Sequence, residues 1–154
     1  MMVAMITDWR QQVVDDDAGL ARIFRDTRRV AVLGAKRGRS EPAFFVPEYL
    51  RERGYSILPV NPTLVGETLF GRAVAPTLAD LQQTADVIEV FRRPEHLPGH
   101  ATEILALPWR PAVVWFQLGI RHDGAAERLA RAGIRVVQDR CMMPEHRRLL
   151  KESA

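Results

Sequence analysis

The sequence predicts an α/β fold in which five parallel strands form a doubly wound sheet with helices on both faces. Short apolar runs, each suited to a buried strand, alternate with longer segments whose apolar residues recur at helical spacing. The 154 residues, 47% hydrophobic and 27% charged, suit one globular domain over residues 1–154. Strands that alternate with helices predict a parallel sheet, so we expect a Rossmann-like architecture.

Five segments have the composition of buried strands. Each is a short run rich in apolar residues, and the first of them ends at Gly34. For a doubly wound sheet we expect the order 3-2-1-4-5, with the strands numbered along the chain. The predicted strands are residues 30–33, 55–60, 86–91, 112–117 and 134–138.

Capping residues and apolar spacing predict the helices between these strands. The aspartates at 15–17 can cap a first helix, whereas residues 1–15 are expected to be a mobile N-terminal segment. In the second helix Phe45 belongs to the apolar stripe, and the regular turns should begin near Pro47, because proline disrupts a helix interior. Thr77 followed by Asp80 resembles a capping box at the start of a short helix, and further helices are predicted over residues 94–107, 124–132 (capped by Asp123) and from residue 144 onward.

Composition indicates a reducing compartment and argues against membranes and nucleic acids as partners. Cys141 is the single cysteine, which excludes an intrachain disulfide. The chain starts without a basic segment followed by an apolar run, and its longest apolar stretches, such as 112–116, are too short to span a bilayer. The net charge of +3 comes from scattered arginines rather than a basic stripe. We therefore expect a cytoplasmic protein.

The loop after the first strand, residues 34–40, is the segment best suited to an anionic ligand. In doubly wound sheets, ligands lie outside the carboxyl ends of the strands. Gly34 permits a sharp turn, the next helix N-terminus favours phosphate, and Lys36, Arg37 and Arg39 add positive charge. The pattern is neither GxGxxG nor GxxxxGK[ST], and an ordinary solvated turn is the alternative.

Three further strand ends should lie at the same edge of the sheet. The second strand is followed by Asn61 and Pro62 instead of the acidic residue typical of NAD-binding domains, although a plain turn explains them equally well. Phe91 and Arg92 lie at the end of the third strand. There they could contact an adenine or a phosphate, or Phe91 could belong to the core and Arg92 to the solvated surface. Gly119, after the fourth strand, suits either a close ligand approach or a tight connection.

Catalytic motifs are absent from the sequence. There is no GxSxG or HExxH motif, and no pair of carboxylates at a spacing that indicates acid–base chemistry. His96 and His100 are four residues apart on a predicted helix, but no third ligand accompanies them. We predict no metal site and no catalytic residue, and the chain by itself is not expected to be an enzyme.

Six segments of the chain form an ordered pattern. They are VAVLGA (30–35), YLRERGYSILPVNP (49–62), GRAVAPTLADL (71–81), DVIEVFRRPE (86–95), VVWFQLGIRH (113–122) and RVVQDRCMMPEH (135–146). With these segments, residues 28–149 resemble the small CoA-binding proteins of bacteria. That family is similar to the Rossmann-like CoA-binding domain of the succinyl-CoA synthetase α subunit and of related acyl-CoA synthetases. The resemblance implies that the ligand is coenzyme A (CoA).

The resemblance also implies which residues contact CoA. Gly34, Ala35 and Lys36 match the turn expected at the phosphates, while Arg37 and Arg39 lie in a variable part of that loop. The contacts implied at the other strand ends are Val60, Asn61, Pro62, Phe91, Arg92, Gln117, Gly119, Ile120 and Cys141.

Cys141 follows the fifth strand and matches the family pattern. Its thiol is predicted to lie near the thiol of CoA, where a mixed disulfide could form. Arg140 could lower the pKa of this thiol and favour the thiolate. The alternative is a buried cysteine that packs as a small hydrophobic residue.

The synthetases have further domains, one with a phosphorylated histidine, and an ATP-binding partner, and this chain ends before any such region. We therefore expect a non-catalytic or accessory module that binds CoA or an acyl-CoA. One alternative is an NAD(P)-dependent oxidoreductase, which the missing GxGxxG motif and the residue at Asn61 disfavour. Another is the CoA-binding subunit of an acyl-CoA ligase completed by a separate ATP-binding chain. The oligomeric state and any protein partner stay open.

Overall fold

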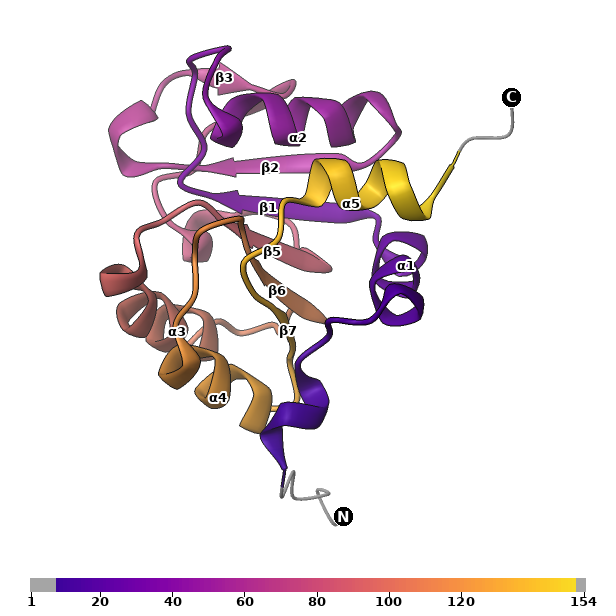
Figure 1. The fold of residues 1–154 in the computed structure, drawn as a ribbon. Helices are drawn as coiled ribbons and strands as arrows, with labels where there is room; N and C mark the ends of the chain where they lie inside the picture. Colours follow the sequence, from indigo (N-terminus) through magenta and orange to yellow (C-terminus); the bar gives the residue numbers. More distant parts are fainter. Residues whose placement is uncertain (1–7, 152–154) are drawn as a thin grey trace.

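A five-stranded parallel sheet with helices on both faces forms the centre of the computed structural model, which describes residues 8–151 (Figure 1). This arrangement confirms the predicted α/β fold class. The strands are β1 (Arg29–Leu33), β2 (Ser56–Val60), β5 (Val87–Val90), β6 (Val113–Phe116) and β7 (Arg135–Val137). The helices are α1 (Asp17–Asp26), α2 (Pro42–Glu52), α3 (Leu97–Leu105), α4 (Asp123–Arg131) and α5 (Met142–Leu149).

The strands lie in the order β2-β1-β5-β6-β7, so the predicted order 3-2-1-4-5 is wrong and the order is 2-1-3-4-5. The outer edge of β2 is already occupied, because Ala75 forms backbone hydrogen bonds with Pro59 and Asn61. β5 pairs instead with the free edge of β1. The carboxylate of Asp86 fixes it there by accepting hydrogen bonds of 2.9 Å from the backbone N–H groups of residues 28 and 29.

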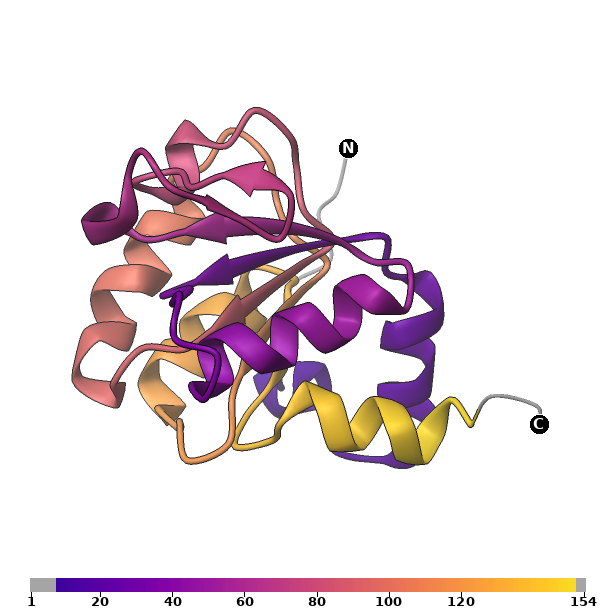
Figure 2. The ribbon, with the colours of Figure 1, turned by 90° about the horizontal axis from the view of Figure 1, so that it is seen from above.

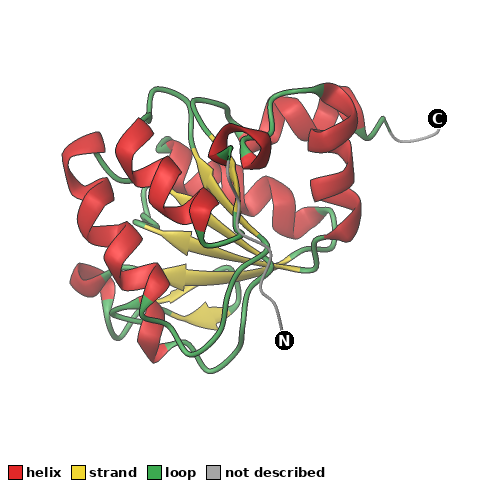
Figure 3. Cartoon of the chain, turned by 90° about the horizontal axis from the view of Figure 1, so that it is seen from below, coloured by secondary structure: helices red, strands yellow, loops and turns green. Residues whose placement is uncertain are grey.

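Two hydrophobic cores lie on opposite faces of the sheet. Helices α3 and α4 cover one face, and α1, α2 and α5 cover the other (Figures 2 and 3). Because both faces are covered, nearly every strand residue is buried, which explains the continuous apolar runs in the sequence. No helix within residues 8–151 combines the length and apolar character needed to cross a membrane.

The segment before α1 packs against the sheet from Asp8 onward. A 3-10 helix, η1 (Trp9–Gln12), places the Trp9 side chain in the core beside α4, and Val13 forms a parallel bridge with Val136 at the outer edge of β7. This packing differs from the mobile segment expected for residues 1–15, of which residues 1–7 lie outside the described part of the chain.

Proline at position 47 does not mark the start of the second helix. Helix α2 begins at Pro42, and Pro47 lies inside it. A proline in a helix interior cannot donate to the carbonyl four residues earlier, which here belongs to Ala43. The backbone N–H of Lys36 donates to that carbonyl instead, at 3.4 Å. The proline therefore leaves an acceptor that ties the loop after β1 to the first turn of α2.

Two helix caps test the sequence predictions. Asp16 caps α1 as expected, since its carboxylate accepts a hydrogen bond from the N–H of Gly19. Asp123 does not cap α4. The cap is Nδ1 of His122, which accepts from the N–H of Ala125 at 3.0 Å.

The helices predicted to start at Thr77 and to span residues 94–107 contain 3-10 structure. The first is a single 3-10 turn, η3 (Leu78–Asp80), and the second begins as η4 (Pro94–His96) before α3. A short antiparallel hairpin of β3 (Thr68–Leu69) and β4 (Arg72–Ala73) precedes η3.

We expect Trp9→Ala to lower the free energy of unfolding by about 3 kcal/mol, because the substitution removes a large buried side chain. Urea denaturation followed by circular dichroism measures the change. Gln11→Ala, an exposed position of the same 3-10 helix, is the control. Equal midpoints for the two variants would show that Trp9 contributes nothing to the core.

Candidate functional site

The strand order places the switch point of the sheet between β1 and β5. The chain leaves β1 toward α2 on one face and leaves β5 toward α3 on the other, and ligands of such sheets lie in the crevice between these loops. A cavity of about 760 Å³ opens beside this crevice, which we call the carboxyl-edge cavity. Its walls come from the loops after β1, β5, β6 and β7 and from the first turn of α2.

The carboxyl-edge cavity brings together most of the residues predicted from the strand ends. Four separate loops contribute to it, so the convergence is a property of the sheet topology. The predicted residues that line it are Lys36, Phe91, Arg92, Gln117, Gly119, Ile120 and Cys141.

A second group of predicted residues lines a smaller neighbouring cavity of about 140 Å³, here called the small cavity. Arg92 is the predicted residue that borders both cavities. Ala35 and Arg37 line neither cavity. The small cavity contains the predicted residues Gly34, Val60, Asn61, Pro62 and Arg92 together with His100 and Glu103.

Gly34 is required by a close contact at the switch point. Its φ is +89°, and a Cβ atom at this position would lie 2.5 Å from the carbonyl oxygen of Phe91 and 3.1 Å from Cδ of Arg92. Only glycine accommodates both the backbone conformation and the contact. The absence of a side chain allows the stem of Arg92 to pass directly over the start of the β1 loop.

The first amides of the loop after β1 are used by the fold. The N–H groups of Gly34 and Ala35 donate to the carbonyl of Val60, at 3.0 and 3.2 Å, and that of Lys36 donates to Ala43. The amides of residues 37–40 have no hydrogen bond within the described part of the chain. Within this loop, the amides available to a ligand are therefore those of residues 37–40, which line neither cavity.

Asn61 has a structural role at the end of β2. Its Nδ2 donates to the carbonyl of Ala35 at 2.7 Å, and its Oδ1 accepts from both the N–H and the hydroxyl of Thr63 at 2.8 Å. The side chain thus holds the β1 loop and begins the 3-10 turn η2 (Pro62–Leu64). The interpretation of Asn61 as a turn residue therefore matches these contacts.

Arg37 pairs with the hairpin instead of lining a cavity. Its Nη1 lies 3.2 Å from each carboxylate oxygen of Glu67, so an exposed ion pair joins the β1 loop to the segment before β3. Lys36 lies 3.9 Å from Glu41, also on the surface. Exposed pairs of this kind contribute less than about 1 kcal/mol, and a bound phosphate can compete with them.

A buried carboxyl group lies beneath the carboxyl-edge cavity. Glu89, in the middle of β5, is fully buried, and its Oε2 accepts a hydrogen bond of 2.5 Å from Nε2 of Gln117, a cavity residue. The other oxygen, Oε1, has no hydrogen-bond partner among the described residues. Burial raises the pKa of Glu89 from 4.5 to about 8, although the bond from Gln117 opposes the shift.

Cys141 lines the carboxyl-edge cavity and is half-buried. Burial raises the pKa of its thiol, so the expectation that Arg140 lowers this pKa is wrong. The guanidinium of Arg140 is directed elsewhere. It donates to the carbonyl of Asp15 at 3.0 Å and lies 3.5 Å from Glu145.

Several residues of the cavities were not predicted from the sequence. Phe45 belongs to the predicted apolar stripe of its helix, yet 36% of it is exposed. The side of the helix that is buried carries Ala43, Val46 and Leu50 instead. Leu118 is 69% exposed at the rim of the same cavity. The helical spacing of Ala43, Val46 and Leu50 could have shown that Phe45 lies outside the buried side of the helix. No local signal marks Leu118.

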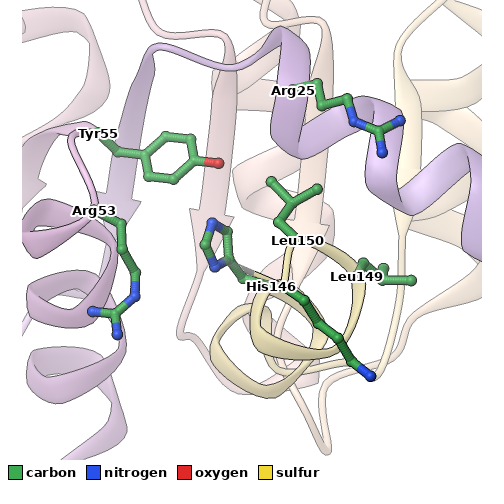
Figure 4. A pocket seen from close by; sticks show the side chains of 7 residues that line it. Arg25, Arg53, Tyr55, His146, Leu149 and Leu150 are labelled. Atoms are coloured by element: carbon green, nitrogen blue, oxygen red, sulfur yellow. The ribbon is translucent and has the colours of Figure 1, made fainter. Parts of the chain in front are cut away.

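A cavity of about 560 Å³ at the opposite edge of the sheet is not the candidate site. Tyr55, which precedes β2, and the buried His146 of α5 form part of its wall, with Arg25 and Arg53 nearby (Figure 4). None of the predicted ligand contacts lines it, and ligands of doubly wound sheets lie at the other edge. Within residues 8–151 no group of three or more His, Cys, Asp or Glu side chains could hold a metal ion.

The sheet topology and the cavity at its switch point define a doubly wound α/β domain with a candidate ligand site at the carboxyl edge of its sheet. Residues 28–147 match the family described as "CoA binding domain". Because the match covers most of the chain, this protein belongs to that family, and the resemblance inferred from the six segments is confirmed.

Individual relatives are similar over nearly their whole length. The YneT protein of Bacillus subtilis (strain 168) is 33% identical over 129 residues, which cover 84% of this chain and 93% of the relative. The solved structure of cell-free ID.343 from Thermus thermophilus is 48% identical with a TM-score of 0.83, and covers 88% of this chain and 99% of that one. A Pyrococcus horikoshii OT3 structure is 31% identical with a TM-score of 0.81, over 88% and 93%.

We expect Glu89→Gln to remove a pH-dependent loss of stability. From pH 4.5 upward the unfolded chain releases the Glu89 proton, whereas the folded chain keeps it until about pH 8. The free energy of unfolding should therefore fall through this window, by at most about 1.4 kcal/mol per pH unit. The variant should match the wild type near pH 4.5 and become the more stable protein as the pH approaches 8.

Urea denaturation at several pH values measures this difference. Glu95→Gln, at an exposed position, controls for the loss of one carboxylate. If the stabilities of the wild type and Glu89→Gln stay parallel from pH 5 to 8, the buried carboxyl does not have the raised pKa.

We expect iodoacetamide to alkylate Cys141 more slowly at pH 7 than it alkylates free cysteine, because a raised pKa leaves less thiolate. Intact-mass analysis reports this thiol alone, since the chain has one cysteine. In urea the rate should approach that of free cysteine. A folded-state rate above that of free cysteine at pH 7 would instead indicate a lowered pKa.

Proposed function

We propose that this protein binds coenzyme A or an acyl-CoA at the carboxyl edge of its sheet, as a binding module. The observation that carries the proposal is the composition of the carboxyl-edge cavity. Apolar side chains from the first turn of α2 and from the loops after β5, β6 and β7 line a space of about 760 Å³ that is bordered by cationic groups at the switch point. CoA combines an uncharged, flexible pantetheine arm with a phosphorylated ADP end, so its two parts match the two kinds of wall.

The cationic side of the cavity suits the phosphates. Lys36 comes from the β1 loop, and Arg92 and Arg93 come from the end of β5. Arginine can form two parallel hydrogen bonds to a phosphate, and lysine acts as a mobile point charge. Positive charges from the loops after β1 and β5 would surround a phosphate bound at the switch point.

The apolar side of the cavity suits the arm and an attached acyl group. Phe45 and Leu118 belong to the small set of large hydrophobic residues exposed among residues 8–151, and both lie on this cavity. Exposed apolar side chains that gather at a cleft mark ligand or partner surfaces. The half-buried Cys141 lies on the same wall, where the thiol end of a bound CoA could reach it.

The structural role of Asn61 bears on the alternative of a nicotinamide cofactor. Dinucleotide-binding domains use the side chain after the second strand to hold a ribose hydroxyl. Here the amide of Asn61 is occupied by the β1 loop and by Thr63. This occupation of Asn61 and the membership in the CoA-binding family both favour CoA over a nicotinamide cofactor.

We expect Arg92→Ala to weaken CoA binding by roughly 10- to 100-fold, since charge-assisted hydrogen bonds contribute about 1.5–3 kcal/mol. Calorimetric titration of protein freed of bound ligand measures the affinity. The wild type should also bind CoA more tightly than NADH or NADPH.

Arg110→Ala is the matched control. It removes the same charge from an exposed position outside both cavities, before β6 and so at the amino end of the sheet. Preference of the wild type for NADH or NADPH, or equal CoA affinity in the two arginine variants, would contradict the proposed site.

A further inference from the structure

A chain of hydrogen bonds leads from Arg92 into the body of the protein. Nε–H of Arg92 donates to Nε2 of His100 at 3.3 Å. The other ring nitrogen of His100, Nδ1, lies 3.3 Å from Oε2 of Glu103. Oε1 of Glu103 accepts from the backbone N–H of Leu78 at 3.4 Å. The end of β5 is thereby connected through α3 to the turn η3.

The donors and acceptors of this chain determine the tautomer of His100. The Nε–H of arginine can only donate, so Nε2 of His100 must accept and carries no proton. The proton that the ring carries on Nδ1 is then directed at Glu103. The bond from His100 is also the main reason that the pKa of Glu103 is lowered, which keeps this carboxylate ionised.

The same arrangement leaves the far end of the Arg92 guanidinium open. Its Nη1 and Nη2 groups form no hydrogen bond with residues 8–151, and Arg92 borders both cavities. Only 18% of the His100 side chain is exposed, so the group that holds Nε is itself fixed. Gly34 leaves room for the stem of Arg92 on the other side.

We propose that His100, oriented by Glu103, is a positioning residue that holds Arg92 with its two Nη groups directed at the ligand phosphates. This inference rests on the proposed CoA function, and it names how the phosphate contact is made. A free arginine side chain loses rotamer freedom when it binds, whereas a side chain already ordered by His100 binds without that loss. Glu103 keeps Nε2 of His100 available as the acceptor by accepting the hydrogen bond that Nδ1–H donates.

His100→Leu and His100→Gln test this role by CoA titration. Leucine keeps most of the volume but cannot accept a hydrogen bond, so CoA affinity should fall by roughly three- to tenfold. Glutamine offers an amide oxygen to Nε of Arg92 and an N–H to Glu103, so its affinity should return most of the way to the wild-type value. His96→Leu, a histidine that lines neither cavity, is the matched control.

A double-mutant cycle separates positioning from a general structural effect. In the Arg92→Ala background, His100→Leu should cause no further loss of CoA affinity, because the group that it positions is gone. A full additional loss in that background, or equal affinities of His100→Leu and His96→Leu, would overturn the inference.

A measurement without ligand keeps the inference apart from the proposed function. In the ¹H–¹⁵N spectrum of arginine side chains, the Nε–H signal of Arg92, assigned by its loss in Arg92→Ala, should exchange slowly with water. In His100→Leu it should exchange rapidly. Failure of the wild type to bind CoA would contradict the proposed function, whereas a rapidly exchanging Nε–H in the wild type would contradict the contact with His100.

Discussion

The close contact between Gly34 and the end of β5 is the constraint on which the site depends. Without a side chain at Gly34, the β1 loop approaches within contact of the carbonyl of Phe91, and the stem of Arg92 crosses above it. The N–H of Phe91 continues the ladder to Leu33 at 2.9 Å, so the two strands stay paired up to the point where they separate. Beyond that point the chain turns to opposite faces, and Arg92 borders both cavities at this place.

Polar groups beneath the candidate site reduce the stability of the sheet that carries it. Glu89 lies in the central strand between Val32 and Trp115, and one of its oxygens has no hydrogen-bond partner among the described residues. A fully apolar residue would be expected at such a position. Polar groups that conflict with local stability are commonly found at functional sites. The bond from Gln117 connects this carboxyl group directly to the wall of the carboxyl-edge cavity.

The fold class and the gathering of the candidate residues at one edge of the sheet were predictable because both depend on local patterns. Buried runs that alternate with helical spacing imply a parallel sheet, and the carboxyl ends of parallel strands meet at one edge. For this reason residues as distant in sequence as Lys36 and Cys141 were assigned to the same site, and the structure brings them to one cavity.

The strand order and several side-chain roles depend on contacts that no local pattern contains. Apolar runs do not specify their neighbours, and here Ala75 and Asp86 decide which edge β5 can use. The hydrogen bond that compensates Pro47 comes from Lys36, in a different segment of the chain. Burial of Cys141, which reverses the expected direction of its pKa shift, is likewise a tertiary property.

Both outer strands of the sheet are covered by segments that are not strands. Val13 lies against β7, and Ala75 lies against β2. Exposed strand edges are the usual places where copies of a protein join through shared backbone hydrogen bonds. A neighbouring molecule would have to displace one of these two segments before it could extend the sheet. Adding a strand to this sheet would therefore cost the backbone hydrogen bonds that these two segments already make.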